Sequence, residues 1–171
     1  MNMKKFYPVF AAAALIFFSG CGYKFGSLMH PQITSVAVAP VTNESLFYNA
    51  SAVLRQKLTE VFTTDGSLKL KSIGSADCIV YARILKITFK ETSGHIRDDD
   101  DFLPNEWTVS AEIEYSVILP GRAKPLLGPR TVTGHAEFVS DADLENARTN
   151  GMRQAMFDAA KTIVANLTEA W

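Results

Sequence analysis

The clearest structural signal in the chain is the alternating run EWTVSAEIEYSVIL, residues 106–119. Successive side chains of a β-strand point to opposite faces, so this run predicts a strand with one face in a core and the other in water. At about 3.3 Å per residue the strand is roughly 45 Å long. Its core face carries the apolar residues Trp107, Val109, Ala111, Ile113, Tyr115, Val117 and Leu119.

Two more long strands are predicted on either side of this run. Residues 77–91 place Ile79, Tyr81, Leu85, Ile87 and Phe89 on one face and Cys78, Val80, Ala82 and Ile84 on the other. Residues 131–140 alternate again after a connection, 120–129, that is rich in proline and glycine. Strands that follow one another through such connections form an antiparallel meander.

Helical patterns lie before and after the meander. A first strand over residues 33–41, stopped by Pro40, leads into a predicted helix over 49–64, with Asn49 as its N-cap and Asp65-Gly66 as its end. A short strand is expected near Leu68 and Leu70. The closing helix is predicted by the spacing of Met152, Met156, Phe157, Ala160, Ile163, Val164, Leu167 and Trp171. Asp141 or Asp143 caps its first turn, and Asn150-Gly151 is expected to break it.

This order of elements predicts an α+β fold. Two amphipathic helices on one face of a mostly antiparallel, four-stranded sheet bury both apolar stripes at once, which gives a two-layer sandwich. The mature chain is long enough to build such a core as a single domain.

The N-terminus has the layout of a secretory leader. Lys4 and Lys5 precede an apolar run, 6–18, that is too short to cross a bilayer, since a membrane-spanning helix needs about 20 apolar residues. The sequence Phe18-Ser19-Gly20-Cys21 resembles a bacterial lipobox, in which the cysteine becomes lipid-modified. The alternative is an ordinary leader in which Cys21 stays free or pairs elsewhere.

The expected organisation is therefore a signal peptide (1–20), a short tether (21–32) and one α+β domain (33–171). The tether reaches at most about 40 Å when fully extended, so the domain stays close to its membrane. Without the two leader lysines, 15 basic residues face 18 acidic ones, which gives no overall attraction to nucleic acid or to anionic lipid, so any basic site has to be local. Cys78 then has no partner for a disulfide and is expected to be a small buried apolar residue.

Several motifs follow one another along the mature chain: Cys21-Gly22-Tyr23-Lys24-Phe25, then Val38-Ala39-Pro40-Val41-Thr42-Asn43-Glu44-Ser45, the Asp65-Gly66 turn, Ala76-Asp77, and Gly151-Met152-Arg153-Gln154-Ala155. Their order and spacing resemble the LPS-assembly lipoprotein family, LptE. The resemblance implies a lipoprotein on the periplasmic face of the outer membrane. Such a protein plugs the β-barrel of LptD, helps that barrel to fold, and contacts lipopolysaccharide.

A second reading also fits the first elements. A strand, a proline, a polar loop and a helix in this order resemble the lipoprotein activators of penicillin-binding proteins, which regulate a cell-wall synthase. The short tether favours the first reading, because an activator needs a long tether to cross the peptidoglycan. A soluble periplasmic ligand-binding domain is a third and weaker alternative.

Two charged clusters are candidate binding sites. Arg122, Lys124 and Arg130 lie around one hairpin connection and are suited to phosphates, so they are candidate contacts to lipopolysaccharide. The run Asp98–Asp101 has carboxylates that divalent cations favour, but a calcium loop spaces its ligands, so a solvated loop tip is expected and no metal site is predicted. Solvated loop charge remains the alternative for the basic cluster as well.

No catalytic constellation is present in the sequence. His30, His95 and His135 are isolated, there is no pair of cysteines at zinc spacing, and there is no glycine-rich phosphate loop. The sequence therefore predicts a protein that is not an enzyme and needs no cofactor.

Overall fold

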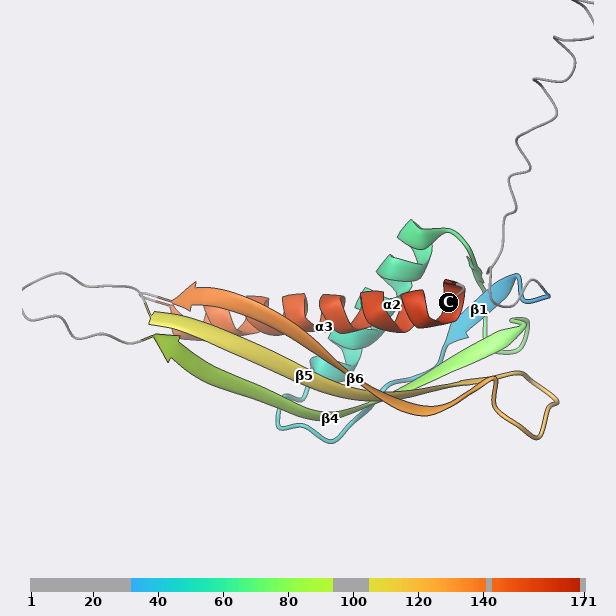
Figure 1. The fold of residues 1–171 in the computed structure, drawn as a ribbon, viewed down its shortest axis with the longest axis horizontal. Coiled ribbons are helices and arrows are strands. Elements are labelled where there is room, and N and C mark those ends of the chain that lie inside the picture. The colour runs from blue at the N-terminus through green and yellow to red at the C-terminus, as the bar shows by residue number, and fades with distance from the viewer. Residues whose placement is uncertain (1–31, 94–104, 141–142, 170–171) are drawn as a thin grey trace, which may run out of the picture.

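The structure is a computed structural model that describes residues 32–93, 105–140 and 143–169. Two helices, α2 (Ala50–Asp65) and α3 (Leu144–Thr168), pack on one face of a twisted sheet (Figure 1). The predicted two-layer α+β architecture is confirmed. The predicted signal peptide, Cys21 and Asp98–Asp101 lie outside the described residues.

The sheet is mixed, and its six described strands correct the prediction of four. They are β1 (Ser35–Val38), β2 (Thr42–Asn43), β3 (Lys69–Leu70), β4 (Cys78–Ser93), β5 (Asn105–Ile118) and β6 (Leu127–Ser140). Their order is β3-β1-β4-β5-β6, with β2 also paired to β4. The predicted meander β4-β5-β6 is antiparallel, whereas β1 pairs in parallel with both β3 and β4.

Pro40 explains why one predicted strand becomes two. It has no N–H to donate to a ladder, and the chain steps away from β4 around it. The Ala39 N–H still donates to the Val80 carbonyl at 2.9 Å, and the ladder resumes where Thr42 pairs with Arg83. Three residues of the first strand therefore lie opposite two of β4, which separates β1 from β2.

A β-bulge in β4 changes which of its residues face the core. The register shifts between Ile84 and Lys86, so Leu85 has no partner on β5. Ile84 and Ile87 consequently lie on the same, helix-facing side. The prediction that Ile87 and Phe89 share a face with Tyr81 is wrong for this reason: Tyr81 is on the other face and is 42% exposed.

The helix ends follow the predicted signals, with two corrections. Gly66 ends α2 in the left-handed region at φ 69°, and its N–H donates to the Phe62 carbonyl. Asn49 is at the N-cap position, but its side chain makes no capping hydrogen bond. Asp143 caps α3 by accepting from the Asn146 N–H at 3.1 Å. The predicted break at Gly151 is wrong, because α3 is continuous.

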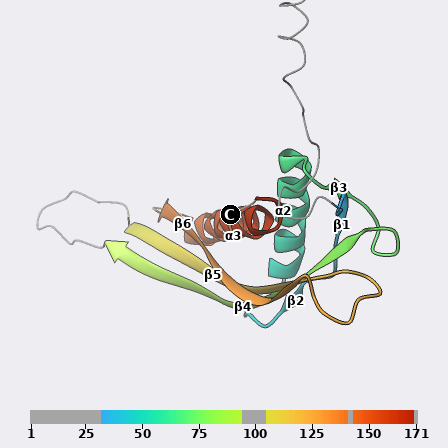
Figure 2. The ribbon, with the colours of Figure 1, turned by 45° about the vertical axis from the view of Figure 1, so that its right-hand side comes forward.

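Two glycines let α3 lie directly on the sheet (Figure 2). A Cβ at Gly151 would come within 2.5 Å of the Phe138 ring. A Cβ at Gly134, on β6, would overlap the carbonyl oxygen of Ala155 and lie 2.6 Å from the nitrogen of Ala159. Along α3, the helix and the sheet are therefore in direct backbone contact. The rest of the core is filled by large buried side chains, which include Tyr115, Phe62, Leu54, Leu58, Ile113, Met156 and Ile163.

Replacing Gly134 by alanine should lower the free energy of unfolding by about 2–3 kcal/mol, because the added methyl group has to push α3 off the sheet. Urea denaturation measures this loss. Gly128→Ala is the matched control, since Gly128 is on the same strand and a Cβ there meets nothing within 4 Å. Equal stabilities for the two variants would contradict the close contact between α3 and β6.

Candidate functional site

The side chains that carry chemistry in enzymes are dispersed in this fold. Among the described residues, no group of three or more His, Cys, Asp or Glu side chains could hold a metal ion. His135 lies on the open side of β6, where its Nδ1 is 3.1 Å from the Ser110 hydroxyl. His30 and His95 lie outside the described residues. None of the described helices has the length and apolar character needed to cross a membrane.

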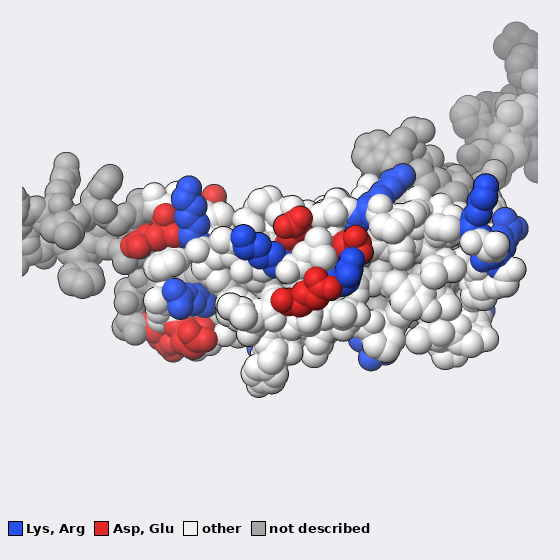
Figure 3. Space-filling view, turned by 90° about the horizontal axis from the view of Figure 1, so that it is seen from below, with Lys and Arg blue, Asp and Glu red and all other residues white. Residues whose placement is uncertain are grey.

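The sheet face opposite the helices, called the open face here, is polar and partly ion-paired. On β5 it presents Thr108, Ser110, Glu112, Glu114 and Ser116 and ends at the half-buried Ile118, as the alternation predicts. Arg83 joins two elements across it, with one guanidinium nitrogen 2.7 Å from Glu114 and another 3.1 Å from Glu44. The hydrogen bond that Arg83 donates to Glu114 and the charges of both carboxylates raise the pKa of Arg83. Figure 3 shows the resulting mixture of positive and negative side chains across the middle of this face.

The loop between β2 and α2 presents two apolar side chains to solvent. Leu46 is 100% exposed and Tyr48 is 90% exposed, while Phe47 between them packs against Phe89 at 5.3 Å between ring centres. The Asn43 amide holds the loop, because its nitrogen donates to the Phe47 carbonyl at 2.7 Å and its oxygen accepts from both the N–H and the hydroxyl of Ser45. The exposure of Leu46 and Tyr48 is therefore imposed by an ordered loop, and neither residue is among the candidate contacts predicted from the sequence.

The predicted phosphate-binding residues lie at the end of the domain where the expected tether joins Gln32. This end, called the tether end, is formed by Gln32–Ser35, 69–71, Asp77 and the β5–β6 connection. Arg122 lines a shallow depression of about 360 Å³ there, together with Gln32, Asp77 and Leu119. Lys124 lies on the same exposed connection.

Arg130 is not on the connection itself. It pairs with Tyr115 inside the β5–β6 ladder, so strand alternation puts it on the helix-facing side of the edge strand. The structure thus brings Arg122 and Lys124 together on one turn and leaves Arg130 at the neighbouring edge of the sheet. All three side chains are exposed, and none forms an ion pair with a described residue.

Asp77 orders the strands at the tether end. One of its carboxylate oxygens accepts from the Thr34 N–H, the Thr34 hydroxyl and the Ser35 hydroxyl at 2.8–3.0 Å. Led by the bond from Ser35, these hydrogen bonds lower the pKa of Asp77 to about 2. The adjacent Cys78 is a buried free thiol, and burial raises its pKa to about 12, as expected for an apolar core residue rather than a reactive one.

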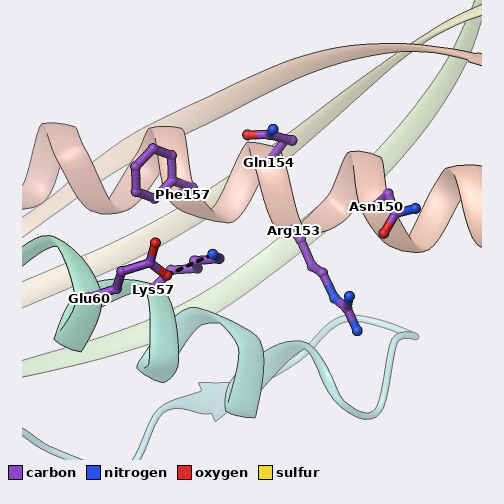
Figure 4. Close-up of a pocket in the computed structure, with 6 residues that line it drawn as sticks. All are labelled: Lys57, Glu60, Asn150, Arg153, Gln154 and Phe157. Atoms are coloured by element: carbon purple, nitrogen blue, oxygen red, sulfur yellow. Dashed lines mark hydrogen bonds and ion pairs between the residues drawn. The ribbon is translucent and has the colours of Figure 1, made fainter.

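A groove of about 410 Å³ separates α2 from α3 on the helical layer (Figure 4). Its walls are Lys57, Glu60, Asn150, Arg153, Gln154 and Phe157. Lys57 pairs with Glu60 at 2.7 Å and also lies over the Phe157 ring at 5.4 Å, so its charge is matched locally. The groove depends on how the two helices cross, which the spacing of residues within each helix does not indicate.

Aromatic side chains gather at the far end of the sheet, opposite the tether end. Trp107 stacks on Phe138 with 6.4 Å between ring centres, and the Arg148 guanidinium lies over Trp107 at 5.1 Å and over Phe89 at 5.8 Å. These contacts attach the first turns of α3 to β4, β5 and β6. A depression of about 200 Å³ lies beside Trp107 and Phe138.

No protein-family model matches the sequence, and a comparison with curated proteins finds no relative. Solved structures do share the fold. A protein from Caulobacter crescentus described as a candidate lipoprotein is 12% identical, with a TM-score of 0.50 over 75% of this chain and 88% of that chain. A candidate homologue of a neuraminyllactose-binding hemagglutinin from Helicobacter pylori is 10% identical, with a TM-score of 0.54 over 89% and 92%.

A PelC dodecamer from Paraburkholderia phytofirmans is also similar. It is 12% identical, with a TM-score of 0.51 over 89% of this chain and 95% of that chain. At such identities these likenesses show the fold alone.

The hydrogen bonds to Asp77 make stability depend on pH in a defined direction. The pKa of Asp77 is depressed from 3.8 to about 2 in the folded protein, so the stabilisation is complete above about pH 5 and is lost as the pH falls toward 2. Asp77→Asn should therefore be less stable than the parent at neutral pH, and the gap should close at acidic pH. Chemical denaturation across this range measures the gap.

Asp65→Asn is the control for this measurement, because the Asp65 carboxylate accepts one hydrogen bond, from the Ser67 N–H, from the described residues. The difference in stability between Asp65→Asn and the parent should change much less with pH than the difference between Asp77→Asn and the parent. A gap for Asp77→Asn that stays constant down to pH 2 would contradict the assignment.

Proposed function

We propose that this protein is a lipoprotein of the outer membrane, anchored through Cys21 on the periplasmic face, that acts in lipopolysaccharide transport. In this role it plugs an LptD-like β-barrel and helps the barrel to assemble. The leader and the Ser19-Gly20-Cys21 site support the anchor. The fold supports it further, because the structurally similar Caulobacter protein is described as a candidate lipoprotein.

The open face of the sheet is the observation that carries the plug role. Along β5 from Thr108 to Ser116 this face is exposed or half-buried, whereas Ala37, Ala39 and Ile79 at its β1 end are buried. Its polar groups are already partly matched through Arg83, Glu44 and Glu114. The interior of a large barrel is polar and hydrated, so such a face can lie inside one without burying unpaired charge in lipid. The three long strands, β4, β5 and β6, provide a surface long enough to extend through much of a barrel.

Leu46 and Tyr48 supply the apolar anchors that a stable protein contact needs. Binding energy at interfaces concentrates in a few large side chains that become desolvated, and tyrosine is among the most frequent. The ordered loop holds both side chains outward before any partner binds, which reduces the entropy lost on association. Ile73, in contrast, is an exposed apolar residue in a different turn, so it serves as a control.

Purification of the lipoprotein from its native envelope under mild detergent tests this role. A large β-barrel protein should be recovered in near-equal amount. The double variant Leu46→Ser, Tyr48→Ser should lower that recovery several-fold while keeping the parent stability, because neither side chain is buried in the free protein. Ile73→Ser should leave the recovery unchanged.

Other results would point to other functions. Recovery of a murein synthase in place of a barrel would favour the activator of a penicillin-binding protein. Recovery of a large homo-oligomer would favour assembly as in the structurally similar PelC dodecamer. An N-terminal fragment without lipid on Cys21, seen by mass spectrometry, would contradict the anchor.

Lipopolysaccharide is proposed to contact Arg122, Lys124 and Arg130, whose guanidinium and ammonium groups are suited to phosphates. Replacing all three by glutamine should weaken lipopolysaccharide binding at least tenfold at moderate salt, as measured by fluorescence titration of the purified lipoprotein. This estimate of about 1.4 kcal/mol or more corresponds to the loss of one or two charge-assisted contacts. Unchanged affinity would remove these residues from the contact.

A further inference from the structure

Basic side chains extend across the full width of the tether end. Lys69 lies on β3, and Lys71 directly follows that strand. Arg122 and Lys124 lie on the β5–β6 connection, and Arg130 lies on β6. Because β3 and β6 are the two edges of the ordered sheet, the row spans about 19 Å at roughly 4.8 Å per strand. None of the five forms an ion pair with any described residue.

Few acidic groups oppose this row. The carboxylate of Asp77 is used within the protein, where it accepts three hydrogen bonds from Thr34 and Ser35. Asp65 at the end of α2 accepts the Ser67 N–H, and Glu169 follows α3. In Figure 3 the only charged side chains visible at the right-hand end, which is the tether end, are Lys and Arg.

The far end of the sheet has the opposite charge. Its described residues include Glu91, Glu106, Glu137, Asp143 and Glu145, against Lys90 and Arg148. Arg148 is moreover placed over two aromatic rings, away from a free surface. Positive and negative charges are thus separated along the long axis of the domain, and the positive end is the tether end, where the described residues begin at Gln32.

We propose that the tether end is a membrane seat, which rests on the anionic phosphates of phospholipid headgroups and holds the long axis away from the bilayer. A single phosphate ligand needs converging donors, but these five side chains are spread along a line, as suits a plane of many phosphates. A second copy of the chain cannot meet this end with its own basic row, because the two rows would repel one another. The proposal rests on the lipid anchor at Cys21, which brings this end to the bilayer.

The lipid anchor attaches the protein to the membrane, and the membrane seat would fix the orientation of the attached domain. Each basic residue held near an anionic membrane favours the bound orientation by roughly fivefold, and the effect falls off within a Debye length. A tether that reaches at most about 40 Å would by itself allow the domain to lie in many orientations. The polar charge distribution selects one, because the acidic end is repelled by the same surface.

The test uses the full acylated protein reconstituted into vesicles, with a fluorophore on an introduced cysteine. Ala123→Cys places the label on the tether end, and Asn150→Cys places it on α3; Cys78 does not react because it is buried. Headgroup spin-labelled lipid should quench the label at 123 in vesicles of equal parts phosphatidylcholine and phosphatidylglycerol, but far less in phosphatidylcholine alone or at high salt. The label at 150 should remain unquenched in all of them.

Two charge-neutralised variants locate the seat. Lys69→Gln with Lys71→Gln should reduce the quenched fraction about fivefold or more, although neither residue belongs to the proposed lipopolysaccharide contact. Lys86→Gln with Lys90→Gln, on β4 away from this end, is the matched control and should change nothing. Quenching that does not depend on the charge of the lipid would overturn the proposal. An equal reduction of quenching by both pairs of substitutions would also overturn it.

Vesicle flotation separates the seat from the anchor. A protein that floats with vesicles of both compositions but shows no quenching at 123 is anchored without being seated, which overturns this inference alone. A protein that floats with neither overturns the seat, and the mass of its N-terminal fragment then decides whether the proposed anchor fails too.

Discussion

The close contact between α3 and the β5–β6 pair is the constraint on which the rest of the structure depends. Gly134 allows the backbone of α3 to touch the sheet at Ala155 and Ala159. A helix of 25 residues is about 37 Å long, so once it lies this close it covers most of the core face of both strands. It also reaches the sheet edge, where Asp158 accepts the His135 N–H. Burial is thus concentrated on one face, and the opposite face has to be compatible with water.

Regular patterns in the sequence predicted the parts of the fold that local geometry determines. The alternation in 106–119 assigned each β5 side chain to its correct face, and Gly66 and Asp143 marked helix ends correctly. The errors came from non-local events. The bulge at Leu85 reverses the alternation in β4, and the parallel pairs of β1 join segments more than thirty residues apart, which no short pattern encodes.

The same limit applies to the candidate surfaces, because the sequence could group only those residues that a local structure brings together. Arg122 and Lys124 could be placed together because a hairpin connection is a local structure. Lys69 and Lys71 could not be added to them, since their position depends on the parallel pairing of β3 with β1. Leu46 and Tyr48 were missed although they left a signal: three large apolar residues in succession interrupt a polar loop and do not continue the spacing of the helix that follows.

The proposed barrel contact and the proposed membrane seat use different parts of the domain, and this makes them compatible. The open face and the 44–48 loop flank the long axis, whereas the basic row crosses its end. A protein held by its end on a bilayer keeps its sides clear of the headgroups, so the open face and the 44–48 loop stay available to a barrel that the domain has yet to enter. A domain lying flat on its open face would lose that surface to the headgroups. Charge polarity along the axis therefore favours the orientation in which the polar face remains free to meet a protein.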